Sequence, residues 1–386
     1  MKHDSYDNNG RIPQKDGVEE ISVGIYTAGI PRLRHIAEGL TLLENMLIGK
    51  DFHWQRQLEA LLPGRIEIKD GMLINHLPVE KYLECVVGSE MNPASPPEFL
   101  KAHAIISRSW AVGKILGCHP EGDDGKYDTL STLIGWDDTS AHIGFHVCSD
   151  DHCQRYQGVQ PVSPEALEAI RSTQGIVLRD DSGKIVDARF SKCCGGKTEV
   201  FSTCWQDVDM SCLKSFDDPW CDLSNLPEAR KEDVLNSILK DYDLSTGGGY
   251  RWTATVSKES VRQNLLNKFG RDIGEIVSLR ALERGPSGRI SLLHIKGSGG
   301  SLDLGKELWI RRLLSSTHLY SSAFDIEDKG SYVKLTGRGW GHGVGLCQTG
   351  AARMALEGAD AADILRFYYP GSHLSLGRNL IETTPK

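Results

Sequence analysis

The chain has 386 residues, of which 39% are hydrophobic, and its formal net charge is −8. This length allows two or three domains, and this hydrophobic content is sufficient for a packed core. The acidic balance argues against a nucleic-acid partner, whose phosphates would need a basic surface. No stretch of about eighteen apolar residues occurs, so we expect no membrane span. The sequence therefore indicates a globular protein with neither nucleic acid nor a membrane span.

The first twenty residues differ from a secretory signal. They are polar and contain no apolar run, which predicts a disordered lead-in over residues 1–20. Without an export signal, the location that we expect from the sequence is cytoplasmic. Residues 21–26 then alternate apolar with small or polar residues, which is typical of a strand.

Residues 33–77 carry two further patterns. Residues 33–47 are compatible with a helix. Residues 64–71 and 72–77 are predicted to be two short strands, and the Asp-Gly pair between them is a turn signal that predicts a hairpin.

Glu90 is the first candidate catalytic residue. Pro78 suits the start of a helix, and apolar residues follow at helical spacing from Val79 onward. Glu90 lies eleven residues after Val79, which returns it to the middle of the apolar stripe at about 100° per residue. Burial there would raise the pKa of this carboxyl group, as a general acid working near neutral pH requires. The alternative is a helix-end carboxylate in an ordinary ion pair.

Two cations lie on a second predicted helix over residues 98–116, which follows a proline-rich break. Lys101 and Arg108 are seven residues apart and share one face of it, with apolar residues between them. They could bind polar groups of a ligand, or they could pair with Glu90 or another carboxylate. Spacing alone leaves both interpretations open.

A cluster of histidine and cysteine follows between residues 142 and 153. Three histidines and two cysteines fall within these twelve residues. Thiolate and imidazole together suit zinc, with Cys148 and Cys153 on a loop and His142 or His146 as a third ligand. The alternative is a buried thiol pair beside solvated histidines.

The ten cysteines are too sparse for a disulfide scaffold, yet seven of them lie between residues 148 and 221. The section from residue 191 to residue 221 is also rich in aromatic residues and loop signals. It could line a cleft, hold a second metal ion or form a disulfide, and spacing does not decide among these.

The predicted fold class is α+β, with a mixed helical and antiparallel-sheet core and an inserted α/β subdomain. Polar helical and strand patterns over residues 223–322 indicate that subdomain. The core would then comprise residues 21–222 and 323–386.

Alternating glycines from Gly337 to Gly345 form the densest motif of the chain, with Trp340 and His342 between them. Glycine allows positive φ and lets a ligand or another backbone approach closely. The run therefore indicates either a backbone shaped to contact a ligand or a tight, bulged strand that crosses a crowded core.

Several of these segments together resemble the sporulation stage II protein D and LytB family. The resemblance extends over about residues 21–373, and the motifs that carry it are residues 77–83 with 89–91, 100–110, 193–199, 337–345 and 368–371, with Gln348 and Gly350. This sequence departs from the family pattern at Cys347, where serine is usual, and in its dense thiols near Cys193.

The resemblance implies a peptidoglycan lytic transglycosylase in which Glu90 is the single catalytic acid and base. It implies glycan strands or muropeptides as partners, and a glycan cleft lined by Lys101, Arg108, His342 and Gln348. Trp340 and Tyr368 would stack on sugars. The glycine run would let the backbone approach the sugar.

The resemblance also implies a zinc site at His142, Cys148 and Cys153, which is structural because the proposed chemistry needs no cofactor. The family is usually extracytoplasmic, in contrast to the location expected from the N-terminus. Two alternatives stay open: a non-catalytic glycan-binding module that enhances an amidase, and a zinc hydrolase that uses the histidine and cysteine cluster.

Overall fold

The computed structural model describes residues 20–49, 55–92, 95–118, 127–136, 142–150, 153–160, 162–239, 249–316 and 319–376. Residues 1–19 of the predicted lead-in lie outside these ranges, as does His152 of the histidine and cysteine cluster. The described chain mixes helices with mostly antiparallel sheets, so the predicted α+β class is confirmed. No helix in the described ranges is both long and apolar enough to cross a membrane.

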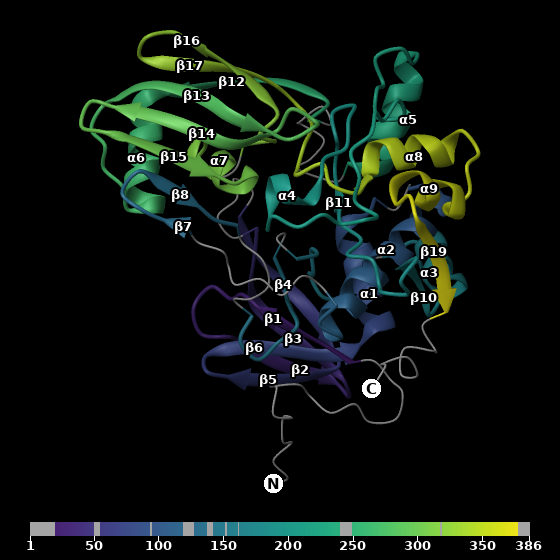
Figure 1. Ribbon diagram of the computed structural model, residues 1–386. Coiled ribbons are helices and arrows are strands. Elements are labelled where there is room, and N and C mark those ends of the chain that lie inside the picture. Colours follow the sequence, from purple (N-terminus) through teal and green to yellow (C-terminus); the bar gives the residue numbers. More distant parts are fainter. Residues whose placement is uncertain are drawn as a thin grey trace.

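Two sheets form the base of the molecule in the view of Figure 1. The first has the order β5-β6-β1-β9 and the second has the order β2-β3-β4. Strand β1 pairs antiparallel with β6 and parallel with β9. The strands are β1 (Glu20–Ile25), β2 (Leu33–Ala37), β3 (Leu40–Ile48), β4 (Arg56–Pro63), β5 (Arg65–Lys69), β6 (Met72–Pro78) and β9 (Val147–Cys148).

The predicted hairpin is confirmed, because β5 and β6 pair antiparallel across Asp70 and Gly71. Both turn residues have positive φ, 48° and 81°, as a two-residue turn of the hairpin type requires.

The helix expected at residues 33–47 was wrong, because this segment forms β2 and β3. A bulge lies between Leu43 and Met46 of β3. The bulge adds a residue on one strand and interrupts the alternation of side chains. Buried positions consequently fall at Leu42, Leu43, Asn45 and Met46, a spacing that imitates a helix.

Most helices pack together at the right of Figure 1. The predicted helix that carries Glu90 is α1 (Val79–Glu90), and the next is α2 (Pro97–Ile115), whose buried residues run along most of its length. The remaining helices of this part are α3 (Pro164–Ser172), α4 (Phe201–Cys204), α5 (Glu228–Ile238), α8 (Gln348–Leu356) and α9 (Ala361–Tyr368). Two small sheets join them: β10 (Ile176–Asp180) with β19 (Ser372–Leu376), and β11 (Phe190–Ser191) with β18 (Leu346–Cys347).

A second group of sheets lies at the upper left of Figure 1. Its sheets have the orders β13-β14-β15-β8-β7 and β12-β17-β16. Strand β8 comes from the N-terminal half of the chain and pairs parallel with β15. The elements are β7 (Tyr127–Asp128), β8 (Thr132–Ile134), β12 (Arg251–Ser257), α6 (Lys258–Phe269), β13 (Ile276–Arg284), β14 (Ile290–Gly297), β15 (Ser301–Gly305), α7 (Glu307–Leu313), β16 (Phe324–Asp328) and β17 (Tyr332–Arg338).

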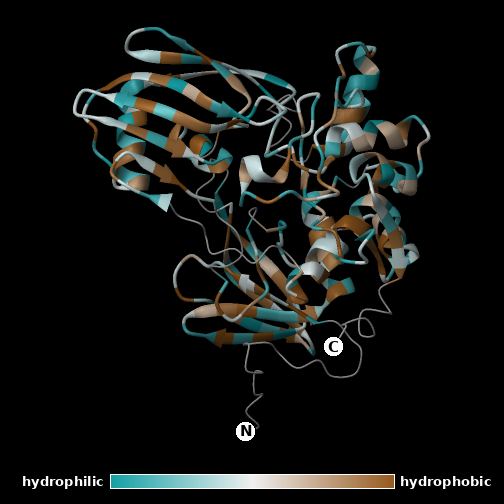
Figure 2. Ribbon diagram, in the orientation of Figure 1, coloured by the Kyte–Doolittle hydropathy of each residue, from teal (hydrophilic) through white to brown (hydrophobic). Residues whose placement is uncertain are grey.

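The described residues contain two large hydrophobic cores. One is built from the basal sheets and the helices, and it includes Ile238 of α5. The other is built from residues 252–335 together with Leu133 of β8. Figure 2 shows hydrophobic residues, drawn brown, along the strands and helices of both groups, among hydrophilic residues drawn teal. The inserted subdomain of residues 223–322 stays a proposal. The second core supports a separate unit, but this core spans residues 252–335 and includes Leu133.

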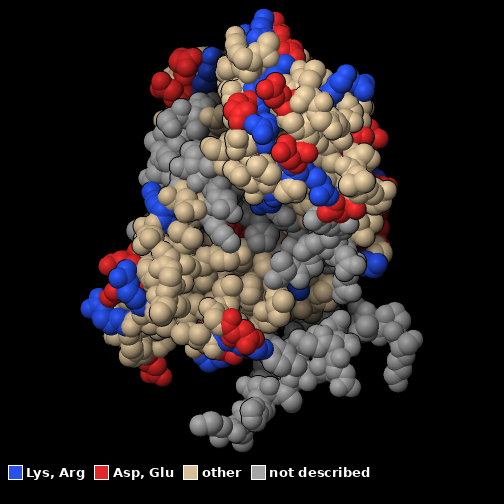
Figure 3. Space-filling view, turned by 90° about the vertical axis from the view of Figure 1, so that its left-hand side faces the viewer, with Lys and Arg blue, Asp and Glu red and all other residues tan. Residues whose placement is uncertain are grey.

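Charged side chains are interspersed on the face seen in Figure 3. Acidic and basic residues lie next to one another there, and a band of uncharged residues crosses between the upper and lower parts. Charges of both signs in alternation do not create the long-range attraction that a single-sign surface would exert on a charged ligand.

Candidate functional site

Glu90 is the last residue of α1 and is half-buried. Its Oε1 accepts a hydrogen bond of 2.9 Å from the backbone N–H of Arg155. The carboxylate therefore lies neither in the dry interior nor freely in water. It is oriented at the helix end by a loop that is distant in the sequence.

The loop over residues 153–157 is attached to α1 and β6 by further contacts. The Tyr82 hydroxyl donates to Gln154 Oε1 at 3.2 Å, and the Gln157 N–H donates to Ser89 Oγ at 3.2 Å. The rings of Tyr82 and Tyr156 stack with centroids 5.7 Å apart. Because these contacts lie on both sides of the Arg155 amide, they fix the position of the group that holds Glu90.

The three predicted zinc ligands converge where this loop begins. Candidate ligand atoms of His142, Cys148 and Cys153 all lie within 4.8 Å of one another, and Cys153 Sγ is 3.8 Å from His142 Nε2. The N–H of Asp150 donates to Cys148 Sγ at 3.4 Å. Burial and the adjacent Cys153 sulfur raise the pKa of the Cys148 thiol, a cost that a divalent cation would offset. The donor set therefore fits zinc with three protein ligands.

His146, the alternative third ligand, lies elsewhere in the local structure. Its Nδ1 is 2.9 Å from the Ser22 hydroxyl oxygen on β1. Burial lowers the pKa of its imidazole to about 4. Of the two histidines left open by the sequence, His142 is the one that lies beside the sulfurs.

The two cations of α2 have different surroundings. The Lys101 ammonium is one-third exposed and pairs with Glu98 at 2.7 Å. The Arg108 side chain is only 2% exposed, and its Nε and Nη2 donate to the two carboxylate oxygens of Glu80, each at 2.8 Å. Arg108 therefore pairs with a carboxylate, one of the two possibilities left open by the sequence, and this ion pair joins α2 to the start of α1. A glycan contact stays a prediction for both.

The glycine run carries the chain from the second core to the first, and its glycines are required by neighbours inside the protein. A Cβ atom at Gly343 would lie 2.5 Å from the guanidinium carbon of Arg289, and one at Gly339 would lie 2.8 Å from Arg289 Nη2. A Cβ at Gly345 would lie 2.1 Å from the Arg189 carbonyl oxygen. The run is the tight segment through a crowded core, and these glycines do not leave open backbone for a sugar.

Arg289 is the centre of that crowded region. It is fully buried, and its guanidinium donates to the carbonyl oxygens of Gly341 and Cys194 and to Ser287 Oγ. Ser287 Oγ in turn donates to Glu199 Oε2 at 2.6 Å. Sequence reasoning missed Arg289, because nothing in its local pattern distinguishes it from the exposed cations of the same region.

His342 and Gln348 each have partners within the protein. His342 Nδ1 accepts from the Val344 N–H at 3.0 Å, and its ring packs edge-on against Trp205 with centroids 4.8 Å apart. Burial, aided by Arg189, holds the pKa of His342 well below its usual range. Gln348 Nε2 lies 3.3 Å from Nε2 of the buried His103 of α2. Their glycan-binding roles stay predictions.

The two aromatic candidates differ in exposure. Trp340 is half-buried and packs edge-on against Tyr320 with centroids 5.6 Å apart. Tyr368 is fully buried, and its hydroxyl donates to Asp218 Oδ2 at 2.9 Å. Stacking on sugars stays a prediction for both, and Trp340 is the one with a partly exposed ring.

The thiol-rich section forms a second cluster, in which ligand atoms of Cys194, Asp218, Cys221 and Cys347 lie within 4.8 Å of one another. Asp218 had not been singled out from the sequence. Its position three residues before Cys221, in a loop rich in aromatic residues, was the available signal.

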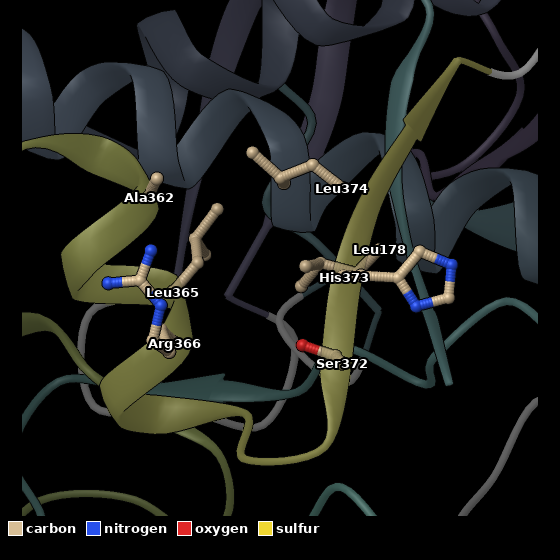
Figure 4. Close-up of a pocket in the computed structure, with 7 residues that line it drawn as sticks. All are labelled: Leu178, Ala362, Leu365, Arg366, Ser372, His373 and Leu374. Atoms are coloured by element: carbon tan, nitrogen blue, oxygen red, sulfur yellow. The ribbon is translucent and has the colours of Figure 1, made fainter. Parts of the chain in front are cut away.

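A pocket of about 280 Å³ opens elsewhere, between α9 and β19 (Figure 4). It is lined by Leu178, Ala362, Leu365, Arg366, Ser372, His373 and Leu374. None of the residues predicted for catalysis, glycan binding or metal binding lines it.

Comparison with known proteins identifies two matched segments. A family described as "Stage II sporulation protein" matches residues 68–179, and a family described as "Domain of unknown function (DUF8618)" matches residues 199–345. The first segment contains Glu90, both cations of α2 and the three predicted zinc ligands. The second contains the whole glycine run and all of the second core except Leu133.

Individual relatives extend the similarity over most of the chain. Stage II sporulation protein D of Bacillus subtilis is 27% identical over 302 residues, which cover 78% of this chain and 76% of that protein. The protein of the same name from Bacillus amyloliquefaciens is 26% identical over 311 residues and is covered to 75%. The amidase enhancer of Bacillus subtilis is 25% identical over 318 residues, but only 40% of its length is covered.

Proposed function

The chain belongs to the stage II sporulation protein D (SpoIID) family, and from this premise we propose that it is a peptidoglycan lytic transglycosylase with Glu90 as its catalytic residue. The observation that carries the proposal is the placement of Glu90. It is a half-buried carboxylate at the end of α1, inside the family segment, and the Arg155 N–H holds one of its oxygens at 2.9 Å. A fixed, partly desolvated carboxyl group is suited to proton transfer.

In the proposed reaction, protonated Glu90 donates its proton to the glycosidic oxygen between N-acetylmuramic acid and N-acetylglucosamine. The bond from that oxygen to C1 of the muramic acid breaks, and an oxocarbenium-like centre develops. The Glu90 carboxylate then takes the proton from the muramic acid O6, and O6 closes on C1. The net change moves one proton from O6 to the leaving oxygen, so neither water nor a second carboxylate is consumed.

The His142, Cys148 and Cys153 site supports this chemistry through position. A zinc ion bound there would supply a fixed cross-link at the start of the loop that contacts α1. Cys153 is two residues before Arg155, so ordering this loop orders the amide that holds Glu90. No step of the reaction requires the metal as a reactant.

For direct glycan contact we favour Lys101 and Trp340, because both are partly exposed. Arg108, Gln348 and Tyr368 are buried and would contribute from the interior, by holding the elements on which the site is built. His342 is half-buried, as Trp340 is.

The decisive variant is Glu90→Gln, which keeps the size of the side chain and removes the transferable proton. General acid–base catalysis contributes about 10²- to 10⁴-fold to rate, so we expect a loss of that size in the release of 1,6-anhydro ends, measured by mass spectrometry. The matched control is Glu84→Gln on the same helix, whose carboxylate pairs with the partly exposed Lys81. Near-normal turnover by Glu90→Gln, or products with reducing ends, would contradict the mechanism.

A non-catalytic amidase enhancer is the second candidate, and the similarity to a relative of that name favours it. An enhancer would bind glycan and stimulate an added amidase without releasing sugars, and Glu90→Gln would not change that stimulation. Assays on intact and on peptide-stripped glycan would separate the two functions and identify the substrate.

The zinc hydrolase is distinguished by its products. It would generate reducing ends, whereas the transglycosylase generates anhydro ends from the same glycan. Full activity after chelation would also argue against a hydrolase. A loss of activity on chelation fits either one, because the metal loop positions Glu90.

A further inference from the structure

The second thiol cluster joins three segments that are far apart in the sequence. Cys194 follows β11, Asp218 and Cys221 lie in the loop before α5, and Cys347 ends β18. All four side chains are at most 1% exposed. Their candidate ligand atoms lie within 4.8 Å of one another, so three sulfurs and one carboxylate face a common point inside the first core.

The distances suit a tetrahedral ion. Zinc–sulfur bonds of about 2.3 Å place tetrahedral ligand atoms about 3.8 Å apart. Cys194 Sγ is 3.3 Å from Asp218 Oδ2, and the whole set spans at most 4.8 Å. The set would need shifts of less than about one ångström to enclose zinc.

Backbone amides are directed at the sulfurs. The N–H of Gly196 donates to Cys194 Sγ at 3.4 Å, and the N–H of Cys194 donates to Cys347 Sγ at 3.2 Å. The Gly195 amide contacts the Cys221 sulfur. Donors of this kind stabilise thiolates and orient them toward a metal.

Asp218 is the strongest sign that a cation belongs here. Its Oδ1 accepts from the N–H groups of Trp220 and Cys221 at 3.1 and 3.2 Å, and its Oδ2 accepts from the Tyr368 hydroxyl. Within the part of the chain that the structure describes, no lysine, arginine or histidine forms an ion pair with it. A buried carboxylate needs a compensating charge, and a divalent ion between it and three thiolates supplies one.

A disulfide is the competing interpretation. Cys193 Sγ lies 3.4 Å from Cys221 Sγ, and a bond of about 2.05 Å would need only a small movement. That bond would occupy Cys221 but would leave the Asp218 carboxylate without a cation. The carboxylate therefore favours the metal.

We propose that Cys194, Asp218, Cys221 and Cys347 bind a structural zinc ion, distinct from the site at His142, Cys148 and Cys153. The ion cross-links the segment after β11, the loop before α5 and the strand β18 that follows the glycine run. It thereby fixes the path of that run through the core. The proposal does not depend on the transglycosylase reaction.

The test counts and characterises metal in protein purified under reducing conditions. The double variant Cys148→Ser/Cys153→Ser removes the first site, and it is expected to retain one zinc ion per chain by elemental analysis. After replacement with Co²⁺, that variant should show sulfur-to-cobalt charge transfer and the visible bands of a tetrahedral ion. Absence of bound metal from this variant would overturn the proposal.

Asp218→Asn provides a second test that keeps the side-chain shape. Removing the charge of a ligand should weaken Co²⁺ binding in the double-variant background by about tenfold or more. Cys212→Ser is the matched control, since this buried cysteine lies outside the cluster. Equal affinities for the Asp218→Asn and Cys212→Ser proteins would contradict the assignment. The wild-type protein should also be alkylated without prior reduction and analysed by mass spectrometry. A disulfide between Cys193 and Cys221 would contradict the assignment as well.

Discussion

The residues that the sequence assigned to one glycan site fall into two regions with different physical character. Around Glu90, the carboxylate is half-buried and a loop holds it through a backbone amide. Along the glycine run, side chains and backbone are packed on one another, with Arg289 enclosed between Gly339 and Gly343. The first region is the one in which we propose the reactive site, and the second is packed like a framework.

A dense motif in a sequence therefore indicates that its residues are constrained, but it does not show whether a ligand or the protein's own core constrains them. Glycines that contact a ligand and glycines that pack against a buried arginine produce the same sequence pattern. Perturbing the framework should change stability, whereas perturbing Glu90 should change the reaction and leave the free energy of unfolding nearly unchanged. Substitutions at Glu80, Gly343 and His103 perturb the packed framework and measure its contribution to stability.

The largest effect is expected at the Arg108–Glu80 ion pair. Glu80→Ala leaves the guanidinium of Arg108, which is 2% exposed, without its partner carboxylate, and this should lower the free energy of unfolding by about 3–5 kcal/mol. Arg108→Met should cost less, because the remaining Glu80 carboxylate is 31% exposed. Urea denaturation of both variants measures the difference.

Glu84→Ala is the control for this pair. It breaks the more exposed contact with Lys81 on the same helix and should cost less than about 1 kcal/mol. If Arg108→Met instead left stability unchanged and weakened only glycan binding, Arg108 would belong to the glycan surface rather than the framework.

The next effect is expected at Gly343. Alanine there meets the Arg289 guanidinium and must adopt a φ of +77°, so the variant should lose about 2–4 kcal/mol. Gly330→Ala is a matched control with a φ of +82° and nothing within 4 Å of the added carbon, and it should lose about 1 kcal/mol. Equal losses would indicate that backbone strain, rather than contact with Arg289, explains the glycine run.

The smallest effect concerns acid sensitivity at His103. Burial, aided by Lys192, lowers the pKa of His103 to about 3 from its ordinary value of 6.5. Below pH 6.5 the unfolded chain therefore binds a proton that the folded chain does not. Stability contributed by this neutral histidine is complete above that pH and decreases by about 1.4 kcal/mol per pH unit on acidification.

His103→Gln removes this proton from the balance between the folded and unfolded chains. The slope of unfolding free energy against pH should therefore decrease by about 1.4 kcal/mol per pH unit between pH 6.5 and 4.5. Urea denaturation at several pH values measures that slope. His35→Gln, at an exposed position on β2, is the matched control. A slope in His103→Gln equal to that of the wild type would show that His103 is protonated in the folded protein.

Local patterns determined much of the fold. Helical spacing after Pro78 predicted α1 with Glu90 near its end, and Asp70-Gly71 predicted the hairpin of β5 and β6. These features depend on nearest neighbours along the chain, so a single sequence carries them. The helix predicted at residues 33–47 was wrong because a bulge in β3 gives its buried residues a helix-like spacing. That bulge is defined by the pairing of β3 with β4, which the sequence does not show.

The sequence also shows that the histidines and cysteines of the predicted zinc site lie within one short segment, and the tertiary structure places His142, rather than His146, beside the two sulfurs. Other features required the tertiary structure. It shows that Arg289 packs against the glycine run and that Arg108 pairs with Glu80. It also shows that Asp218 lies beside three cysteines, two of which come from distant segments. Burial and charge pairing depend on contacts between distant segments, such as Cys194 and Cys347, which are 153 residues apart. The spacing of residues along the chain contains no record of those contacts.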